Sequence, residues 1–357
     1  SYEKEGHRVT YIGDTHPDFA GNVVKAVTSG QRIYPKIVES FGERVNETGD
    51  AAAYEQFRSS MTEKLQARVV SVERLTHDAI ELIVKAPLAA SRYKPAQVFR
   101  LQNYETVAAR VEGTRLQTET LPLTGSRVDA EAGTISVIVR DRGASSRLVS
   151  TFKAGDPLVL MGPSGNGPIL PEHEAVLIVG DWLAAAAARS LGPAFRAKGN
   201  KVLLALNLPT ADDLFCLDDL EIASDVLLVA SQNGKPAQLR RKQDRAVNGD
   251  ITDTLVQYAE GKLHDGNVPL SLSSITHLQI TADNALLRKL NQARHNELKP
   301  HFPESIKTTG SIYSTMQCML KGVCSQCLQW QKDPKTGQRT KAVFACSWHD
   351  EPLDLVD

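Results

Sequence analysis

The stretch EAVLIVGDWLAAAAARSLGPAFRAKGNKVLLALN, residues 174–207, decides the fold class of much of this chain. A short apolar segment ends at Gly180, an alanine-rich segment of helical composition follows, and a second apolar segment begins at Lys201. Further segments of the same two kinds follow at 225–231, 276–282 and 285–298. Apolar strands that alternate with helices are typical of a doubly wound parallel sheet. The sequence therefore predicts an α/β lobe from about residue 172.

The part of the chain that precedes this lobe has a different pattern. Short segments with alternating apolar residues, separated by Pro, Gly and Asp, occur at 66–75, 79–87, 96–104, 134–141 and 157–162. Several short strands joined by turn residues indicate a small antiparallel barrel. The predicted fold class is therefore α/β plus all-β, with an antiparallel barrel followed by a doubly wound parallel-sheet lobe.

The bulk composition is that of an ordinary globular protein. The 357 residues are 41% hydrophobic and 23% charged, and this length allows two or three domains. A formal net charge of −1 gives no electrostatic reason to expect binding to nucleic acid or to an anionic membrane. No apolar run approaches the roughly 20 residues of a membrane span, because Asp181 interrupts the best candidate. We therefore expect a soluble, cytoplasmic protein with reduced cysteines.

Most of the cysteines lie close to the end of the sequence, at Cys318, Cys324, Cys327 and Cys346. The spacing C-x5-C-x2-C with a distant fourth cysteine is close to the plant-type pattern that holds a 2Fe–2S cluster. A disulfide is not favoured, since the remaining Cys216 makes the count odd and nothing resembles a secretory signal. Zinc is an alternative, although closed zinc sites usually use two close cysteine pairs and this chain has one. An empty, vestigial site is the third interpretation.

Two further runs combine glycine with residues that suit a ligand. LMGPSGNGPILP, residues 160–171, holds glycines that allow close backbone approach and prolines that fix a turn, and its simpler interpretation is an interdomain turn. RDRGASSRL, residues 140–148, places Gly143 before two hydroxyls and Arg147. Amides and hydroxyls at the start of a helix bind anions, whereas a serine-capped helix is the structural alternative.

Together with the cysteines, these runs make residues 64–357 similar to the ferredoxin-reductase superfamily. The resemblance is to the electron-transfer subunit of dihydroorotate dehydrogenase and to the small subunit of electron-bifurcating ferredoxin:NADP oxidoreductases. It is carried by KPAQVFRLQNY, LPLTGS, GASSRL, GPSGNG, MQCMLKGVCSQC and FACSWHDEPLD. The resemblance implies a flavin-binding barrel, a nicotinamide-type lobe and a C-terminal 2Fe–2S domain, in that order.

The resemblance also implies roles for individual residues. Those expected to contact FAD are Arg100, Leu101 and Gln102 on one strand, Leu123 and Thr124 beside the isoalloxazine, and Gly143, Ser145 and Ser146 at the pyrophosphate. Those expected to ligate the cluster are Cys318, Cys324, Cys327 and Cys346. No catalytic acid, base or nucleophile is implied, because the protein's task is to tune two cofactors by burial and hydrogen bonding.

The flavin strands depart from the family pattern at two places. Leu121 stands where the family usually has a basic residue that pairs with flavin phosphate, and Arg100 or Arg147 offers a substitute. The usual Pro-Gly-Gln-Phe of the first flavin strand is replaced by Pro-Ala-Gln-Val, with Ala96 and Val98 at the changed positions.

The nicotinamide loop departs further. After Gly180 the lobe continues as DWLAAAAARS, without the glycines that let a backbone approach a pyrophosphate. Asp181 puts a negative charge where a phosphate would lie. We interpret this segment as an alanine-rich helix packed on the sheet, and NAD(P) binding stays open.

Residues 1–45 have a separate resemblance, to the tail of the FAD domain in flavoproteins like the small subunit of glutamate synthase. YIGDTHPDFAGNVVKAVTSG matches that tail through Gly13, Asp14, Gly21, Asn22 and Val23. The resemblance implies that Asp14 contacts the flavin ribityl chain. The glycine-rich βαβ unit that starts such a domain is not in this sequence, so another flavoprotein chain or a preceding portion of the same polypeptide would complete it. Helical spacing over 19–41 is interrupted by a glycine and Pro35, which predicts a broken helix.

The sequence thus predicts a flavoprotein-domain remnant, a linker, an FAD-binding barrel, a nicotinamide-type lobe and a 2Fe–2S domain, at 1–45, 46–63, 64–165, 166–305 and 306–357. We hypothesise an electron-transfer module of a larger flavoprotein oxidoreductase, which passes electrons between FAD and a 2Fe–2S cluster and meets a redox partner protein. Transfer from or to NAD(P)H is left open. The alternative is a non-catalytic assembly module with a reductase fold, whose cysteines hold structural zinc or nothing.

Overall fold

The computed structural model describes residues 2–42, 49–311, 323–348 and 350–356. The chain divides into two units, Ser1–Ser60 and Met61–Asp357. Within the described ranges, none of the helices combines the length and the apolar character needed to cross a membrane.

The first unit contains a small hairpin and a long helix. Strands β1 (Tyr2–Lys4) and β2 (His7–Val9) pair antiparallel, and the 3₁₀ turn η1 (Gly13–Thr15) precedes helix α1 (Val23–Phe41). The side chain of Asn22 caps α1 by accepting from the amides of its first turn. The predicted break in this helix is wrong, because α1 runs through Pro35. One proline removes a single backbone hydrogen bond, and the turns on both sides keep their own.

Helix α2 (Ala51–Leu65) follows and extends across the limit between the two units. It occupies most of the range 46–63, which we expected to be a linker. The carboxylate of Asp50 accepts from the amides of Ala52 and Ala53 and so caps this helix. The segment is polar enough to look like a loop, but its alanines and its cap favour a helix.

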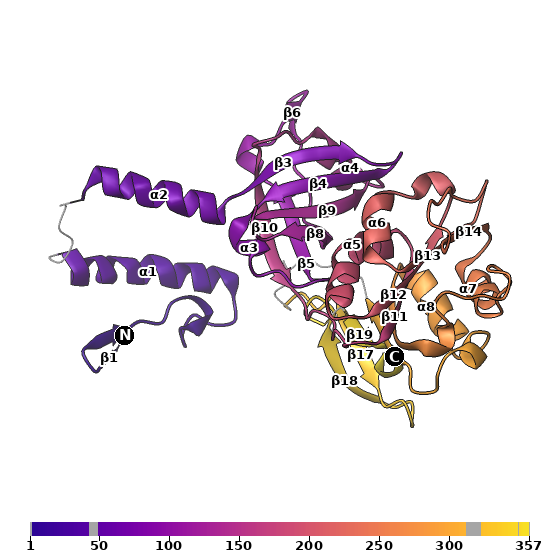
Figure 1. Ribbon diagram of the computed structural model, residues 1–357. Helices are drawn as coiled ribbons and strands as arrows, with labels where there is room; N and C mark the ends of the chain where they lie inside the picture. The colour runs from indigo at the N-terminus through magenta and orange to yellow at the C-terminus, as the bar shows by residue number, and fades with distance from the viewer. Residues whose placement is uncertain (1, 43–48, 312–322, 349, 357) are drawn as a thin grey trace. The chain divides into compact units, whose positions relative to one another are not determined.

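The predicted antiparallel barrel is confirmed. Its strands pair in the closed order β10-β3-β4-β9-β8-β5 (Figure 1). The strands are β3 (Ala67–Arg74), β4 (Ala79–Lys85), β5 (Val98–Asn103), β8 (Leu121–Asp129), β9 (Thr134–Arg140) and β10 (Pro157–Ser164). Alternate side chains fill the interior, among them Leu82, Phe99 and Leu101. Shorter elements join the strands: α3 (Pro87–Ala90), η3 (Glu105–Val107), β6 (Arg110–Val111), β7 (Thr114–Arg115), α4 (Ala144–Leu148) and η4 (Val149–Thr151).

The predicted doubly wound lobe is also confirmed. Its sheet has the order β14-β13-β12-β11-β15-β16-β19, and every neighbouring pair is parallel except β16 with β19. The strands are β11 (Ala175–Gly180), β12 (Lys201–Leu208), β13 (Val226–Ser231), β14 (Arg245–Asn248), β15 (Ile275–Thr281), β16 (Lys307–Ser311) and β19 (Asp350–Pro352). The helices are α5 (Trp182–Ala197), α6 (Leu217–Ala223), α7 (Ile251–Ala259) and α8 (Asn284–Ala293), with 3₁₀ turns η5 (Ala211–Asp213), η6 (Leu272–Ser274) and η7 (Lys299–His301). Separate buried clusters lie on the two faces of the sheet.

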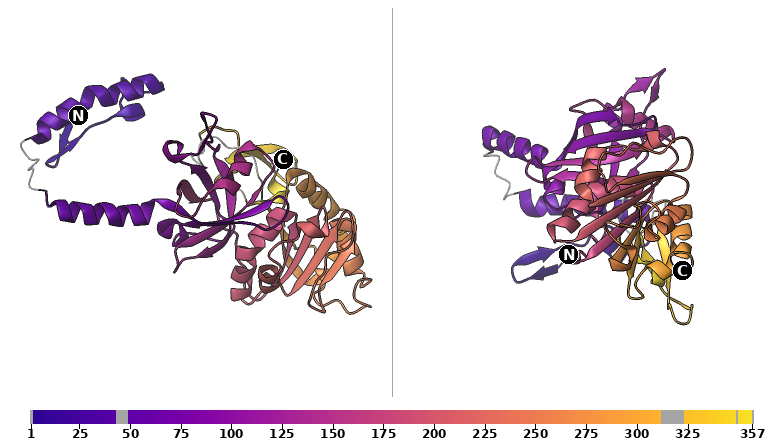
Figure 2. Two further views of the ribbon diagram at one scale, coloured as in Figure 1. Left: turned by 90° about the horizontal axis from the view of Figure 1, so that it is seen from above. Right: turned by 45° about the vertical axis from the view of Figure 1, so that its right-hand side comes forward.

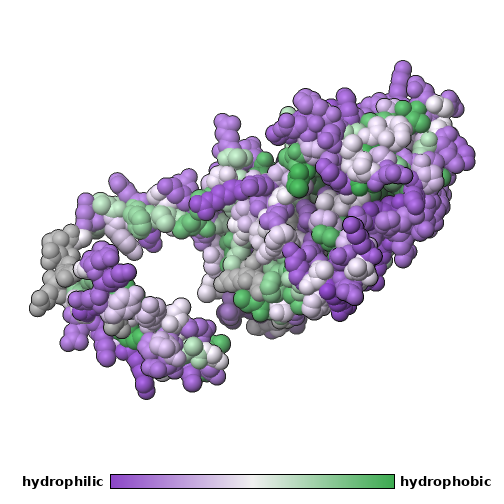
Figure 3. Space-filling view, turned by 90° about the horizontal axis from the view of Figure 1, so that it is seen from below, coloured by the Kyte–Doolittle hydropathy of each residue, from purple (hydrophilic) through white to green (hydrophobic). Residues whose placement is uncertain are grey.

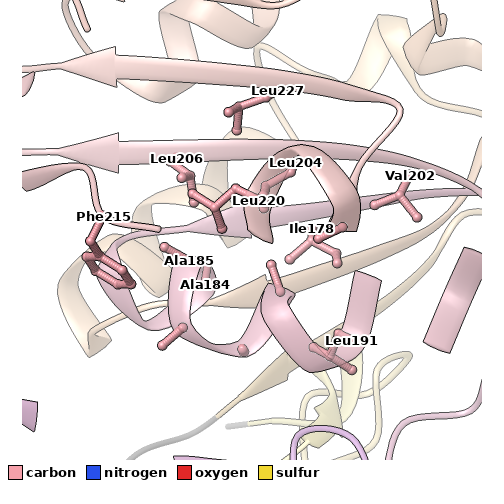
Figure 4. Close-up of a cluster of buried hydrophobic side chains, with 14 of the residues drawn as sticks. Ile178, Ala184, Ala185, Leu191, Val202, Leu204, Leu206, Phe215, Leu220 and Leu227 are labelled. Atoms are coloured by element: carbon pink, nitrogen blue, oxygen red, sulfur yellow. The ribbon is translucent and has the colours of Figure 1, made fainter. Parts of the chain in front are cut away.

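Helix α5 explains the alanine-rich stretch. Ala184 and Ala185 face the strand residues Ile178 and Leu204 in the close-up of Figure 4. Barrel residues such as Ile138 belong to the same buried cluster. Small side chains therefore let α5 pack closely between the sheet and the barrel, as Figure 1 shows by its position.

The C-terminal segment is joined to the lobe more closely than we expected for a separate domain over 306–357. Strands β16 and β19 of this range extend the lobe's sheet, while β17 (Leu328–Lys332) and β18 (Arg339–Phe344) form a hairpin and η8 (Leu353–Leu355) follows. Figure 2 shows the yellow C-terminal strands against the orange part of the lobe. The surface facing the viewer in Figure 3 is mostly polar, with apolar side chains in isolated patches.

Candidate functional site

Two neighbouring barrel strands carry the candidate flavin residues Arg100, Leu101, Gln102, Leu123 and Thr124. Strand β5 pairs with β8 so that Phe99 lies opposite Leu123 and Val98 opposite Thr124. The side chains of Leu101 and Leu123 belong to the buried barrel core, and Thr124 is buried as well. Arg100 is only 2% exposed, so its guanidinium lies within the protein rather than in solvent.

The remaining candidate flavin residues start helix α4. The Ser146 hydroxyl accepts from the Gly143 amide at 3.0 Å and donates to the Gly143 carbonyl oxygen at 3.1 Å. The hydroxyl of Ser145 accepts from the Glu119 amide at 3.0 Å, which ties α4 to the segment that leads into β8. Helix α4 therefore starts at a glycine N-cap, and the Ser146 and Ser145 hydroxyls tie its start to Gly143 and to the segment before β8.

Arginines surround the start of α4. Arg147 pairs with Asp141 at 3.2 Å, and Arg74 pairs with the same carboxylate at 3.1 Å. The hydrogen bond from Arg74, with that from Arg147, holds the pKa of Asp141 below its usual value. Arg147 is well exposed, so its guanidinium is accessible to an anion at the position where the resemblance implies a pyrophosphate.

Two of the predicted cluster ligands, Cys327 and Cys346, lie together in the C-terminal segment, and Cys324 is near enough to Cys327 to affect its thiol. Cys327 and Cys346 are both buried and share a small cluster with Ala345, whose amide donates to the Cys327 carbonyl oxygen at 2.9 Å. Burial raises the pKa of the Cys327 thiol, and the neighbouring thiols of Cys346 and Cys324 add to the rise. Cys318 lies outside the described residues.

The loop after β10 connects the cysteine segment to the barrel. The Ser164 hydroxyl donates to the Cys346 carbonyl oxygen at 3.2 Å, and the Asn166 amide donates to the Ser347 carbonyl oxygen at 3.2 Å. The side chain of Gln97, just before β5, donates to the carbonyl oxygen of Gly165 at 2.8 Å. The sequence showed this loop only as a glycine- and proline-rich turn, and nothing in its spacing identified the contact with the cysteines.

A crevice of about 320 Å³ lies at the carboxyl ends of the lobe's strands. Its lining includes Asp181 after β11, Trp182, and Asp283 after β15. The Asp181 carboxylate accepts from the Leu183 amide at 2.8 Å and from the Asp283 amide at 3.0 Å. Burial raises the pKa of Asp181 to about 6. In open α/β sheets this is the place where nucleotides bind, between the two strands at which the strand order reverses.

A buried ion-pair cluster joins the barrel to the lobe. Arg189 of α5 donates to Glu81 of β4 at 2.9 Å, to Asp219 at 2.7 Å and to the hydroxyl of Ser126 at 3.1 Å. The Ser126 hydroxyl in turn donates to the Ala186 carbonyl oxygen at 2.8 Å. This cluster fixes α5 against the barrel, and sequence reasoning missed it because the partners are distant along the chain.

Another polar cluster, of His77, Asp78 and Asp213, has ligand-type atoms within 4.8 Å of one another. Arg140 already pairs with both carboxylates, and it lies 3.5 Å from Asp213. An arginine thus occupies the position that a metal cation would take. Asp14, the remaining candidate flavin residue, is exposed on η1 of the first unit, and its predicted role stays a prediction.

Comparisons with known proteins fit this arrangement, although no protein-family model matches the chain. The chain is 26% identical over 352 residues to an uncharacterised protein of Rickettsia prowazekii, and the match covers 98% of this chain but 38% of that protein. It is 23% identical over 286 residues to the electron transfer subunit of dihydroorotate dehydrogenase B (NAD(+)) from Bacillus cereus, covering 79% of this chain and 95% of the subunit.

The fold has a similar solved structure. An NADH-dependent reduced ferredoxin-NADP oxidoreductase superposes with a TM-score of 0.63 at 19% sequence identity, over 82% of this chain and 90% of that one. The superposition covers most of this chain, including most of the second unit, where the closed barrel precedes the parallel sheet. In fold and in sequence, the chain is thus similar to proteins of the ferredoxin-reductase superfamily.

Proposed function

We propose that this chain is an electron-transfer module of a larger flavoprotein oxidoreductase, which binds FAD on the barrel and a 2Fe–2S cluster on its C-terminal cysteines. Bound FAD supplies two-electron chemistry and the cluster supplies one-electron transfer, so the module connects a two-electron reaction to a one-electron partner. The similarity to an electron transfer subunit supports this role. The reduced thiols suit the cytoplasm as the place of action.

The observation that carries the proposal is the contact between the cysteine segment and the barrel. Ser164 and Asn166 hold the backbone at Cys346 and Ser347, and Gln97 holds the same loop next to β5. Cofactors that exchange electrons must lie close together. A loop that contacts both candidate sites supports a direct path between them.

The side chains at the two candidate sites are of the kinds that bind FAD and a 2Fe–2S cluster. For FAD, the candidates combine buried Arg100 and Thr124 with the Gly143, Ser145 and Ser146 start of α4. Arg147 compensates for the missing basic residue at Leu121, because its exposed guanidinium lies on α4 itself. For the cluster, soft thiolates at Cys324, Cys327 and Cys346, with Cys318 as the fourth, match the donor set that iron–sulfur clusters require.

We also propose that the first unit belongs to a flavoprotein domain completed by another chain or by a preceding portion of the same polypeptide, with Asp14 near its flavin. The Rickettsia relative, of which this chain matches 38%, is a longer protein and supports such an arrangement. Helix α1 exposes the apolar side chains of Val23, Val27, Tyr34 and Val38. Another part of the flavoprotein domain would cover this apolar surface.

The absorbance spectrum of the purified protein tests the central proposal. We expect flavin bands together with a broad visible band from the cluster, and iron and acid-labile sulfide in equal amounts. A colourless protein with stoichiometric zinc would refute the proposal and favour the assembly module with a structural zinc site. A colourless, metal-free protein would favour the assembly module with empty cysteines.

Cysteine variants assign the ligands. Cys346→Ser and Cys324→Ser should each abolish the cluster band and leave the flavin bands in place. Cys216→Ser is the matched control, since Cys216 lies at the start of α6 in the lobe, outside the C-terminal cysteine segment, and its replacement should leave both bands unchanged. Equal loss of the cluster band in all three variants would contradict the assignment of Cys324 and Cys346 as ligands.

A further inference from the structure

We infer that Asp181 closes the nucleotide crevice of the lobe, so that this chain does not accept a nicotinamide dinucleotide there. The inference rests on the proposed function, because it decides how electrons reach the FAD. The residues that line the crevice do not fit a dinucleotide, for three independent reasons: the helix amides are already bound, the strand ends beneath the crevice are closely packed and the charge is wrong.

The first reason is that aspartate caps occupy the amides that would hold a pyrophosphate. A nucleotide phosphate binds at a helix start through free backbone amides. Here the Asp181 carboxylate accepts from Leu183 in the first turn of α5 and from the amide of Asp283. The Asp283 carboxylate accepts from Ala285 and Leu286 in the first turn of α8.

The third helix start at the crevice is occupied in the same way. Asp250 caps α7 by accepting from the Thr252 amide at 2.9 Å. Helices α5, α7 and α8 thus each present an aspartate at the crevice, in place of unoccupied amides. The positive ends of three helix dipoles are balanced by the chain's own carboxylates.

The second reason is close packing. A Cβ atom added at Gly180 would lie 1.8 Å from the carbonyl oxygen of Thr281, so the ends of β11 and β15 are already in contact. Trp182 follows directly, and its ring lies 5.6 Å from the guanidinium carbon of Arg140. An indole and a buried carboxylate therefore stand where a family member would offer a loop of glycines.

The third reason is charge. The cations on the wall are Arg140, Arg142 and Lys289. Lys289 pairs with Asp250 at 2.7 Å, and both arginines pair with Asp78. Each of these cations already has a carboxylate partner, and Asp181 and Asp283 add further negative charge. A pyrophosphate entering the crevice would be repelled by the three wall carboxylates Asp181, Asp250 and Asp283, and would compete with a carboxylate for each of these cations.

The closed crevice limits the routes by which electrons reach the barrel FAD. If the lobe does not admit NAD(P)H, the barrel FAD exchanges electrons with protein-bound partners only. One route would run through the cysteine segment, and the other through the flavoprotein domain to which the first unit belongs. The lobe then serves as a scaffold that presents the barrel and the cysteines to those partners.

Calorimetric titration with NADH and with NADPH tests the inference directly. The wild-type protein should show no binding up to roughly 1 mM, a limit set by the weakest affinities that such titrations resolve. Asp181→Gly should bind at least about tenfold more tightly, because it frees two amides and removes a charge. Asp181→Ser removes the charge and frees the Asp283 amide, while its hydroxyl can still cap α5, so it should show a smaller gain in affinity and serves if the glycine variant fails to fold.

The control variant is Asp253→Asn, which removes an exposed acid from the first turn of α7 without touching the crevice. It should bind no dinucleotide. A wild-type dissociation constant below about 1 mM for either dinucleotide, or no gain in affinity in either Asp181 variant, would overturn the inference. Calorimetry does not depend on the cofactors, so loss of FAD or cluster would refute the proposed function without changing this result.

Discussion

Replacement of Arg189 by methionine should strongly lower the free energy of unfolding of the second unit, because it strands a buried carboxylate. The Arg189 side chain is 1% exposed, and it donates to Glu81 of the barrel and Asp219 of the lobe. Glu81 is also buried and accepts from the Ser136 hydroxyl. Methionine fills a similar volume but leaves the Glu81 carboxylate without its cation in a buried position.

The magnitude follows from the cost of an unpaired buried charge. Breaking a buried pair by removing one partner costs about 3–5 kcal/mol in free energy of unfolding. Replacing both partners with apolar residues is often nearly neutral, since no charge is then stranded. The double variant Arg189→Met with Glu81→Leu should therefore be more stable than Arg189→Met alone by at least about 1 kcal/mol.

Urea unfolding followed by circular dichroism measures these differences. The matched control is Arg240→Met, which removes an arginine of the same lobe whose pairs with Asp218 and Glu221 lie on the surface. Exposed pairs contribute about 0–1 kcal/mol, so this variant should unfold almost as the wild type does. Equal effects of Arg189→Met and Arg240→Met on the free energy of unfolding would refute the reasoning, as would a double variant that is no more stable than Arg189→Met.

Two further changes test local features of the lobe. Because burial raises the pKa of Asp181 from 3.8 to about 6, the folded state holds this proton more tightly than the unfolded chain, and the associated stability is complete below pH 4 and lost as pH rises through 6. The loss amounts to about 3 kcal/mol, and Asp181→Asn should remove this part of the pH dependence in urea unfolding; an unchanged profile would contradict it. Gly192→Ala should cost about 1–3 kcal/mol, because the added Cβ would lie 2.3 Å from the Ala223 carbonyl oxygen. Gly30→Ala in α1, where the nearest atom lies 4.0 Å from the added Cβ, is the control and should be neutral or stabilising in thermal unfolding.

The strands were the most predictable part of the fold. Alternating or continuous apolar runs identified five barrel strands and the inner strands of the lobe, because each run is buried on at least one face. Strand β8 was missed, since its glycine, proline and hydroxyl residues do not alternate clearly. The course of α1 through Pro35 differs from the prediction, and α2 was not predicted, because both helices depend on caps and helix length rather than on periodicity.

The candidate site was predictable only where residues repeat a known spacing. The spacing of the cysteines predicted a metal site, and the absence of glycines after Gly180 predicted a departure from the nicotinamide loop. The contact of Ser164 with Cys346 joins residues 182 positions apart, and the pair of Arg189 with Glu81 joins residues 108 apart. Such contacts follow from the tertiary arrangement of strands and helices, which local sequence does not encode.

The way the C-terminal strands join the lobe has a consequence for how the protein matures. The cysteine segment leaves the sheet at β16 and returns to it at β19, and Gln331 of the hairpin donates to buried Glu351 at 2.9 Å. In small zinc domains the metal supplies the folding energy and the apoprotein is unfolded. Here the backbone pairing of β16 and β19 in the lobe's sheet anchors the cysteine segment at both ends. We therefore expect cluster insertion to be a late step, performed on an apoprotein that has already folded.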